Sequence, residues 1–323
     1  MSQLYPLRFE PIFRRYLWGG RRLKEVLGKP IGPHSDYAES WEIVDHGEDQ
    51  SVVSNGPLRG KTLAELVRTD GAALFGRHHP QPRFPLLFKL LDANAQLSVQ
   101  VHPNDPHAAK LTPPDFGKTE AWVILAVEPG SYIYAGVKRG FDRHALAREI
   151  ARGTCELCLH RFEPKVGDCI FLPAGTIHAL GPGLLVAEIQ QSSDTTYRVY
   201  DWNRLGPDGN PRALHVEEAL EVIDFTTGPV QAQRPQSTED PHRQRLVECD
   251  KFILDRLQLN SPQSIAGDNR CHILCVLEGR VTVENDPANC PLEVGESILL
   301  PASSAPLTVS PAANSVFLDA YLP

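Results

Sequence analysis

The alternation of apolar and polar residues along the chain predicts a protein built mainly of β-strands. Residues 38–44 alternate charged and apolar side chains, so a strand is expected there, with Glu39 and Glu42 on a solvated face rather than acting as an acid/base pair. The segment that begins at Phe84 is an apolar strand interrupted by Lys89, which either lies at an edge or points into a polar site. Further apolar strands are expected over residues 118–127 and 184–190.

A smaller number of segments show helical periodicity. Residues 61–75 carry apolar side chains near helical spacing, and Thr62 followed by Glu65 matches a capping box at the start of one or two short helices. Helices are also predicted over residues 141–152 and Val216–Val222, and the proline-rich residues 104–117 are expected to form a loop with a short helix. The helices therefore look like insertions in a β-sheet protein.

One strand carries a row of polar side chains on a single face. Residues 97–102 alternate strictly, which places Ser98, Gln100 and His102 on one face and three aliphatic side chains on the other. A polar row that ends in a His-Pro pair is hard to explain as a solvated surface. We expect this face to enclose a polar site.

A second histidine follows a tight corner of the chain. The apolar strand Cys169–Leu172 leads into a Pro-Ala-Gly turn and then to His178. The proline restricts φ and the glycine permits the bend, so the direction of the histidine is fixed, which suits a metal ligand. The spacing from Gly167 to His178 also resembles the second half of the metal-site signature of cupin β-barrels. The alternative is an ordinary turn followed by a core or surface histidine.

The C-terminal part of the chain repeats this pattern in weaker form. Residues 271–279 resemble residues 120–130, and residues 295–306 keep the glycine and proline of the first corner but have Pro306 in place of the histidine. The sequence therefore predicts two cupin or jelly-roll β-barrels, the second degenerate and structural. The polar, proline-bearing residues 226–245 are expected to be a linker. The predicted domains are 1–235, catalytic with helical insertions, and 236–323, without metal ligands.

Composition limits the classes of partner and the compartment. The 323-residue chain has a net charge of −8, which argues against nucleic acid or an anionic membrane as partner. An early apolar signal segment and a bilayer-spanning run are not found, and the seven cysteines are an odd number scattered along the chain. We therefore expect a reducing cytoplasm. Cys155 and Cys158 form a C-x-x-C pair without a second pair nearby, so a redox or zinc role for them is disfavoured.

Four polar residues at the predicted strand ends form a plausible metal site. Gln100 and His102 share a strand face, and Glu120 and His178 arrive from other strands. Two imidazoles, a carboxylate and an amide oxygen suit one divalent ion, with Zn²⁺ favoured. This set leaves most of the charge of the ion uncompensated, as a Lewis-acid site requires.

Cationic and acidic residues follow in the next strands. Arg198 and Arg204 are candidates for holding a phosphate or stabilising an oxyanion, and the alternative is surface arginines paired with Asp194 and Asp201. Glu188 is a candidate proton carrier, with a salt-bridged edge residue as the alternative.

Four motifs in order resemble one enzyme family: L-S-V-Q-V-H-P-N-D, G-K-T-E-A-W, L-P-A-G-T-I-H-A-L-G and S-S-D-T-T-Y-R-V-Y-D-W-N-R. They look like the type I phosphomannose isomerases in their short bacterial form. The N-terminal segments P-I-F-R-R-Y-L-W-G-G, A-E-S-W-E-I-V-D-H and F-P-L-L-F-K-L-L-D-A-N match as well, so the resemblance covers essentially the whole chain.

The resemblance implies a role for each candidate residue. It places the zinc ligands of the family on Gln100, His102, Glu120 and His178, and the catalytic arginine on Arg198. Residues lining the sugar-phosphate pocket fall on Ser98, Lys89 and Lys118. Arg204 stands where some relatives have lysine, which keeps the charge but changes the geometry. All four expected ligands are present, so nothing marks the chain as an inactive homologue.

The expected reaction is the interconversion of mannose 6-phosphate and fructose 6-phosphate through an enediol(ate), with one Zn²⁺ per chain. Zinc and Arg198 would stabilise the oxyanion, and the general base is left open between Glu188, Lys118 and a zinc-bound water. Ser98, Arg204 and Lys89 are expected to hold the phosphate.

Two alternatives belong to other functional classes. A non-catalytic sugar-phosphate-binding cupin would be expected to lose Arg198 or a ligand, and another metal cupin enzyme such as a dioxygenase would favour a richer histidine set than one that includes Gln100. The expected partner is a small-molecule sugar phosphate, with neither nucleic acid nor membrane, and the expected oligomeric state is a monomer or weak homodimer.

Overall fold

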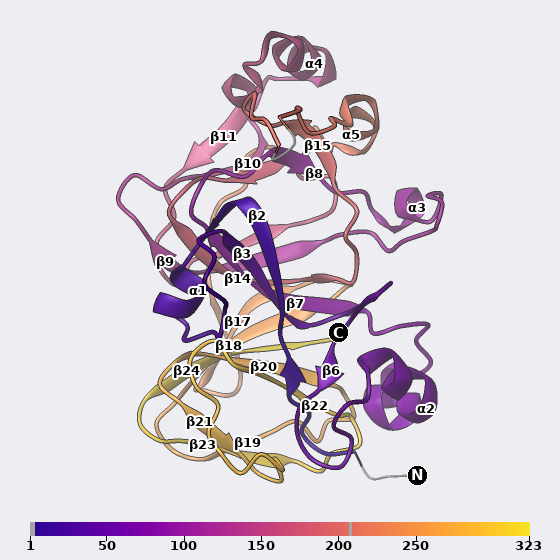
Figure 1. Ribbon diagram of the computed structural model, residues 1–323, viewed down its shortest axis with the longest axis vertical. Helices are drawn as coiled ribbons and strands as arrows, with labels where there is room; N and C mark the ends of the chain where they lie inside the picture. The colour runs from indigo at the N-terminus through magenta and orange to yellow at the C-terminus, as the bar shows by residue number, and fades with distance from the viewer. Residues whose placement is uncertain (1–3, 207–208) are drawn as a thin grey trace.

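Two pairs of antiparallel sheets form two β-barrels, one above the other (Figure 1). The computed structural model describes residues 4–206 and 209–323. The prediction of a mainly β chain with two barrels and few helices is confirmed. We infer that the first barrel ends near residue 235, where the strands of the second begin.

The first barrel consists of a six-stranded and a five-stranded sheet. The six-stranded sheet contains, in spatial order, β12 (Cys169–Leu172), β9 (Glu120–Val127), β14 (Leu184–Gln191), β7 (Leu86–Ala93), β3 (Tyr37–Ile43) and β2 (Ile12–Gly20). The five-stranded sheet contains β11 (Leu159–Phe162), β10 (Ile133–Val137), β13 (His178–Leu180), β8 (Val99–Val101) and β15 (Tyr197–Tyr200).

The second barrel has the same plan on a smaller scale. Its larger sheet contains β16 (Gln236–Ser237), β17 (Arg243–Glu248), β18 (Ile253–Leu259), β24 (Ser315–Tyr321), β20 (His272–Glu278) and β22 (Ser297–Leu300). Its smaller sheet contains β19 (Gln263–Ile265), β23 (Leu307–Pro311) and β21 (Val281–Val283). Two short ribbons pair β1 (Phe9–Glu10) with β6 (Val52–Val53) and β4 (Asp45–His46) with β5 (Asp49–Gln50).

The helices lie outside the sheets and are short. They are α1 (Arg22–Glu25), α2 (Leu63–Phe75), α3 (Asp105–Ala108), α4 (Arg143–Arg152), α5 (Val216–Val222) and the 3₁₀ helices Gly76–His78 and Cys155–Cys158. The predicted capping box is confirmed, because Thr62 and Glu65 each bond to the backbone of the other, and Asp70 interrupts the helix. Within the described residues, every helix is too short or too polar to cross a bilayer.

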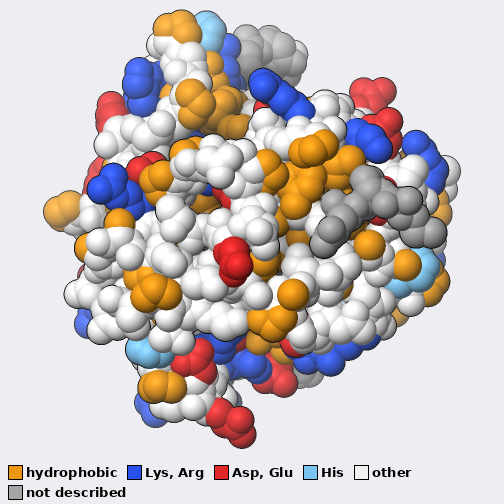
Figure 2. All heavy atoms as spheres, turned by 90° about the horizontal axis from the view of Figure 1, so that it is seen from below, with side chains coloured by type: hydrophobic (Ala, Val, Ile, Leu, Met, Phe, Trp, Pro, Cys, Tyr) orange, Lys and Arg blue, Asp and Glu red, His pale blue; other side chains and the backbone are white. Residues whose placement is uncertain are grey.

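The two barrels share one hydrophobic core. Apolar residues on the outer face of β7, such as Phe88 and Leu90, belong to the same cluster as Leu254 of β18 and Leu318 of β24. The N-terminal segment closes this junction, since the backbones of Leu7 and Leu299 exchange two hydrogen bonds. Figure 2 views the molecule from below, on the side of the second barrel. This face shows mainly uncharged side chains and backbone.

Two local expectations are wrong. Glu39 and Glu42 are buried rather than solvated, because each finds a polar partner inside: the indole N–H of Trp41 for Glu39 and the ammonium of Lys29 for Glu42. The predicted linker is not a free spacer either. The backbones of Val230 and Gln233 donate hydrogen bonds to the first barrel, and strands β16 and β17 begin within the segment.

Equivalent strand registers show which residue of the second barrel stands at the position of Glu120. In the first barrel Leu172, directly before a proline, pairs with Glu120, whereas in the second barrel Leu300, also directly before a proline, pairs with His272. The counterpart of Glu120 is therefore His272. The sequence comparison of residues 271–279 with residues 120–130 aligned Cys271 with Glu120, which is one residue too early.

The second barrel uses its inward-facing charges to neutralise one another. Asp255 and Asp319 pair across neighbouring strands, as Lys89 and Glu188 do in the first barrel. Arg243 Nη1 lies 2.7 Å from Asp255 and 2.8 Å from Asp319. Because every member is paired, this cluster has the character of a structural element.

His272 completes that cluster and predicts a pH-dependent stability. Burial opposes its charged form, but Asp319 and Asp268 outweigh burial and raise the pKa of His272 to about 9. A raised pKa stabilises the fold fully below the unfolded value near 6.5, and this contribution is lost as the pH rises to about 9. The contribution is on the order of 3 kcal/mol.

The substitution His272→Gln should therefore lower the melting temperature strongly at pH 6, and by much less at pH 10. Calorimetric melting of both proteins over this range measures the difference, with the exposed His144→Gln as the matched control. A wild-type-to-variant difference that is constant with pH would contradict the assignment.

Candidate metal centre and substrate cavity

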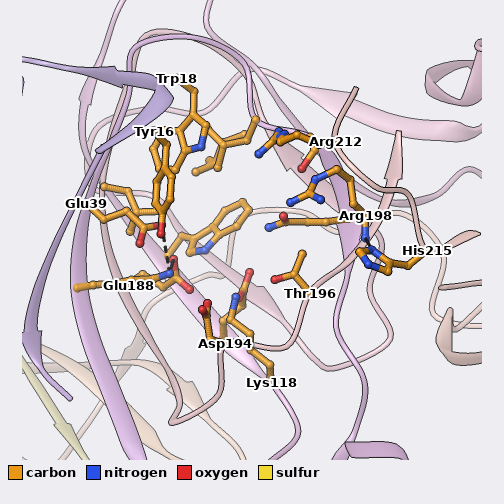
Figure 3. A pocket seen from close by; sticks show the side chains of 18 residues that line it. Tyr16, Trp18, Glu39, Lys118, Glu188, Asp194, Thr196, Arg198, Arg212 and His215 are labelled. Carbon is orange, nitrogen blue, oxygen red and sulfur yellow. Dashed lines mark hydrogen bonds and ion pairs between the residues drawn. The ribbon is translucent and has the colours of Figure 1, made fainter. Parts of the chain in front are cut away.

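A polar cavity of about 300 Å³ opens between the two sheets of the first barrel (Figure 3). Residues of both sheets line it, together with the bulge of β2 and the segments on either side of β15. The lining residues are Tyr16, Trp18, Glu39, Lys89, Leu91, Leu97, Ser98, Gln100, Lys118, Glu120, Trp122, Leu180, Glu188, Asp194, Thr196, Arg198, Arg212 and His215.

Three candidate metal ligands meet beside this cavity: Glu120 lines it, and His102 and His178 lie next to Glu120 outside the lining. One ligand atom from each of His102, Glu120 and His178 lies within 4.8 Å of the other two. His178 Nε2 lies 3.2 Å from Glu120 Oε1, and His102 Nε2 lies 3.5 Å from Glu120 Oε2. Within residues 4–206 and 209–323, this is the one group of three or more such side chains.

The backbone fixes the orientation of both imidazoles. His102 Nδ1 donates to the carbonyl of Thr195 at 2.9 Å, and His178 Nδ1 donates to the carbonyl of Thr176 at 2.9 Å. A carbonyl oxygen can only accept, so each ring carries its proton on Nδ1 and directs the lone pair of Nε2 toward Glu120.

The electrostatics keep both rings neutral. Burial, helped by the neighbouring Lys118 ammonium, lowers the pKa of His102 well below its usual range, and burial lowers the pKa of His178 to about 4. Neutral imidazoles are the form that binds metal.

The residues present fit a divalent cation. Glu120 is 1% exposed, and neither of its carboxylate oxygens has a hydrogen-bond partner. Lys118 Nζ lies 3.2 Å from Glu120 Oε2 and 3.1 Å from His102 Nε2. The amide nitrogen of Gln100 lies 3.3 Å from His178 Nε2, and a half-turn of the amide places its oxygen there instead. A buried carboxylate without donors is the feature that a bound cation would satisfy.

Strand pairing explains why distant residues converge. In the five-stranded sheet, His178 of β13 pairs with Gln100 of β8, which pairs in turn with Arg198 of β15. Paired residues on neighbouring strands share a face, so these three side chains form one row across the sheet. Glu120 and Glu188 project toward the row from the facing six-stranded sheet.

A row of alternating charges covers the other wall of the cavity. Lys89 Nζ lies 3.5 Å from Glu39 and 3.6 Å from Glu188, and all three are buried. Burial opposes the charge of Lys89, but Glu188 and Glu39 raise its pKa. Burial raises the pKa of Glu188 to about 7, although Lys89 opposes this shift. Lys89 is therefore a fixed cation between two carboxylates.

Two guanidinium groups lie side by side opposite that row (Figure 3). Arg198 is held through Nη1 by the carbonyl of Ala213 at 3.0 Å, and its Nε is buried without a hydrogen-bond partner. Burial and the nearby Arg212 lower the pKa of Arg198. The paired cations favour an anion between them.

The structure does not bring every predicted residue to the cavity. Arg204 is absent from the lining, because its guanidinium bonds to Asp201 at 2.5 Å and to the carbonyl of Gln96. Arg212, which the sequence analysis missed, binds the same aspartate and lines the cavity instead. Ser98, Lys89 and Lys118, which the resemblance assigned to the sugar-phosphate pocket, all line this cavity.

The sequence gives only weak signals for the other cavity-lining residues that the sequence analysis missed. Glu39 was assigned to a solvated face by its alternating pattern, and Tyr16 and Trp18 belong to a bulge of β2. In this bulge Tyr37 pairs with both Arg15 and Gly20, which turns the two stacked rings toward the cavity. An L-W-G-G motif signals a turn but not its direction.

Comparisons with known proteins agree with this geometry. The family model described as phosphomannose isomerase type I, catalytic domain, matches residues 7–120, and that of the mannose-6-phosphate isomerase cupin domain matches residues 242–317. Mannose-6-phosphate isomerase ManA of Bacillus subtilis is 37% identical over 92% of this chain and 93% of its own length. The mannose-6-phosphate isomerase of Streptococcus mutans is 35% identical over 92% of both chains.

A solved structure extends the agreement to three dimensions. The crystal structure of a mannose 6-phosphate isomerase from Bacillus subtilis superposes with a TM-score of 0.90 at 32% identity, covering 99% of this chain and 100% of that one. The fold, the ordered motifs and these relatives lead to one assignment: the chain belongs to the type I phosphomannose isomerase family of enzymes.

Proposed function

We propose that the protein is a zinc-dependent aldose–ketose isomerase that interconverts mannose 6-phosphate and fructose 6-phosphate through an enediol(ate). One observation carries the proposal: the buried carboxylate of Glu120, which has no hydrogen-bond partner, faces two oriented imidazoles and lines a cavity that also holds two guanidinium groups. The first three groups suit a metal, and the last two suit an anionic substrate.

Gln100, His102, Glu120 and His178 would hold one Zn²⁺. Neutral imidazoles with Nδ1 tied to carbonyls, and a carboxylate in need of a cation, match the nitrogen and oxygen ligands of catalytic zinc. The bound ion would act as a Lewis acid toward the oxygens on C1 and C2 of the open-chain sugar. The neutral amide and single carboxylate leave that acidity largely intact.

Arg198 would stabilise the negative charge that develops on those oxygens. It belongs to the same cross-strand row as Gln100 and His178, and its position is fixed by the bond to Ala213. A donor held in place before the reaction stabilises the transition state without reorganisation, and losing such a donor typically costs about 10²–10³ in rate.

Glu188 would carry the proton between the two carbons. Its carboxylate would take the proton from C2 of the aldose and return it to C1, while the hydroxyl proton on O2 would pass to O1, so that the carbonyl moves from C1 to C2. The reverse reaction would use the same group. A pKa raised to about 7 by burial, and an Oε1 atom without a hydrogen-bond partner, suit a base that works near neutral pH. Lys118, which lies against Glu120 and His102, is another candidate.

The substrate phosphate would bind to Arg212 and Ser98 rather than to Arg204 or Lys89. Arg212 lines the cavity beside Arg198, whereas Arg204 is directed at Gln96 and Asp201. Lys89 is already engaged by two carboxylates. Holding the phosphate would spend remote binding energy on orienting the reacting carbons.

We also propose the cytoplasm as the location, because all seven cysteines are free thiols, which suits a reducing compartment.

Metal removal tests the proposal directly. The purified protein should convert mannose 6-phosphate in an assay coupled to the detection of fructose 6-phosphate. A chelator that lowers the measured zinc content to zero should abolish turnover, and added zinc should restore it. Full turnover by protein shown to be free of metal would refute a metal-dependent mechanism.

The substitution Arg198→Ala should lower kcat by about 10²–10³, because it removes a contact made mainly in the transition state. Steady-state kinetics with mannose 6-phosphate measure the effect. Arg161→Ala, which removes an arginine outside the cavity lining, serves as the control and should leave kcat close to wild type. An unchanged kcat in Arg198→Ala would remove this residue from the mechanism.

The two arginines bound to Asp201 provide a matched pair for the phosphate site. Arg212→Ala should raise KM for mannose 6-phosphate about 10–100-fold, the value of one charge-assisted hydrogen bond, with a smaller change in kcat. Arg204→Ala should raise KM much less, because its guanidinium lies outside the cavity lining. A larger rise in KM for Arg204→Ala than for Arg212→Ala would assign the phosphate to Arg204 instead.

A further inference from the structure

Asp115 joins the loop before β9 to the segment that orients a candidate metal ligand, although it does not itself line the substrate cavity. Its side chain is 11% exposed and accepts hydrogen bonds on both oxygens. Arg83 Nη2 lies 2.5 Å from Oδ1, and the backbone N–H of Phe116 donates to the same oxygen at 2.8 Å. The Asp115 carboxylate, called the anchor below, is therefore a partly buried group held by a cation and a backbone N–H.

The other oxygen of Asp115 holds the segment 193–196. Ser193 Oγ donates to Oδ2 at 2.8 Å, and Thr195 Oγ1 donates to it at 3.0 Å. The flanking residues Asp194 and Thr196 line the cavity. Two hydroxyl donors on one carboxylate oxygen fix the path of this irregular segment, which has no strand ladder to define it.

That segment reaches the metal centre through a single carbonyl. Thr195 O accepts the Nδ1 proton of His102 at 2.9 Å, and this bond fixes the tautomer and the direction of Nε2. The connection runs from Asp115 through Thr195 to His102, with a hydrogen bond at each step.

The surroundings keep Asp115 ionised. Burial alone would oppose the charge, but His46, Arg83 and Ser193 hold the pKa of this carboxyl well below its usual range. Arg83 is itself fixed, since it stacks on Phe116 at 3.9 Å and donates to the carbonyl of Ser192 at 2.8 Å. The partner of the Asp115 carboxylate is therefore held by contacts of its own.

We infer that Asp115 is a positioning residue for the metal centre: it holds Thr195 so that the Thr195 carbonyl aims His102 at the ion. This inference rests on the proposed zinc site. Hydrogen-bond partners of metal-bound histidines typically account for about 10–100-fold in metal affinity, so a loss of that size is expected when the anchor is released.

The test measures metal binding by the apoprotein rather than turnover. Asp115→Asn removes the charge. The double substitution Ser193→Ala with Thr195→Val removes the two hydroxyl donors, together with the 3.3 Å bond from the Thr195 N–H to Ser193 Oγ, and keeps Asp115, Arg83 and the Thr195 carbonyl. Both should raise the zinc dissociation constant about 10–100-fold in competition with a chromophoric chelator. The visible spectrum of the cobalt-substituted protein should change in band position, since it reports ligand geometry.

Asp255→Asn in the second barrel is the matched control, because it also removes a buried, arginine-paired carboxylate but lies outside the cavity lining. It should lower the melting temperature without changing zinc affinity or the cobalt spectrum. Wild-type affinity in both test variants, or an equal loss in the control, would overturn the role of Asp115. Failure of the wild-type protein to bind zinc would instead overturn the proposed metal site.

Discussion

The buried carboxylate of Glu120 is the constraint on which the site depends. It lies inside the first barrel with no hydrogen-bond donor on either oxygen, next to two imidazoles that burial keeps neutral. An isolated buried charge is costly, so this arrangement is stable only with a cation nearby. Lys118 supplies part of that charge at 3.2 Å. The same electrostatic demand makes the site a candidate for binding a metal ion.

In the second barrel, the charged residues at the corresponding strand positions are neutralised by other side chains. By strand register, His272 stands at the position of Glu120, Asp319 at that of Glu188, and Asp255 at that of Lys89. His272 and Asp255 reverse the charge of their counterparts, Asp319 keeps the negative charge of Glu188, and each of the three has an ion-pair partner. One barrel keeps an unsatisfied carboxylate beside an open cavity, and the other fills the equivalent region with ion pairs.

The second barrel also touches the loop that precedes Glu120. Lys251 lies 2.8 Å from Asp105, whose other oxygen accepts from Gly117 at 2.7 Å and from Gln191 at 2.8 Å. Gln191 in turn accepts from the backbone of Thr119 at 3.1 Å, which brackets Lys118 between fixed residues. Because the ion pair of Lys251 is partly exposed, its energy is small, and its effect is one of alignment.

The sequence alone determined the elements whose signals are local: several strands of the first barrel, the capped helix after Thr62, the repeat that indicates a second barrel, and the polar face of Gln100 and His102. Period-two alternation and turn residues fix these features within a few positions, whatever the rest of the chain does. The family motifs supplied Arg198 as well. Tertiary structure decided the rest, because burial depends on which surfaces meet. Glu39 is buried because Lys89 and Trp41 face it. Arg212 lines the cavity and Arg204 does not, because the two guanidinium groups approach Asp201 differently. Asp115 is linked to His102 through Thr195, which lies about 80 positions from Asp115 in the chain.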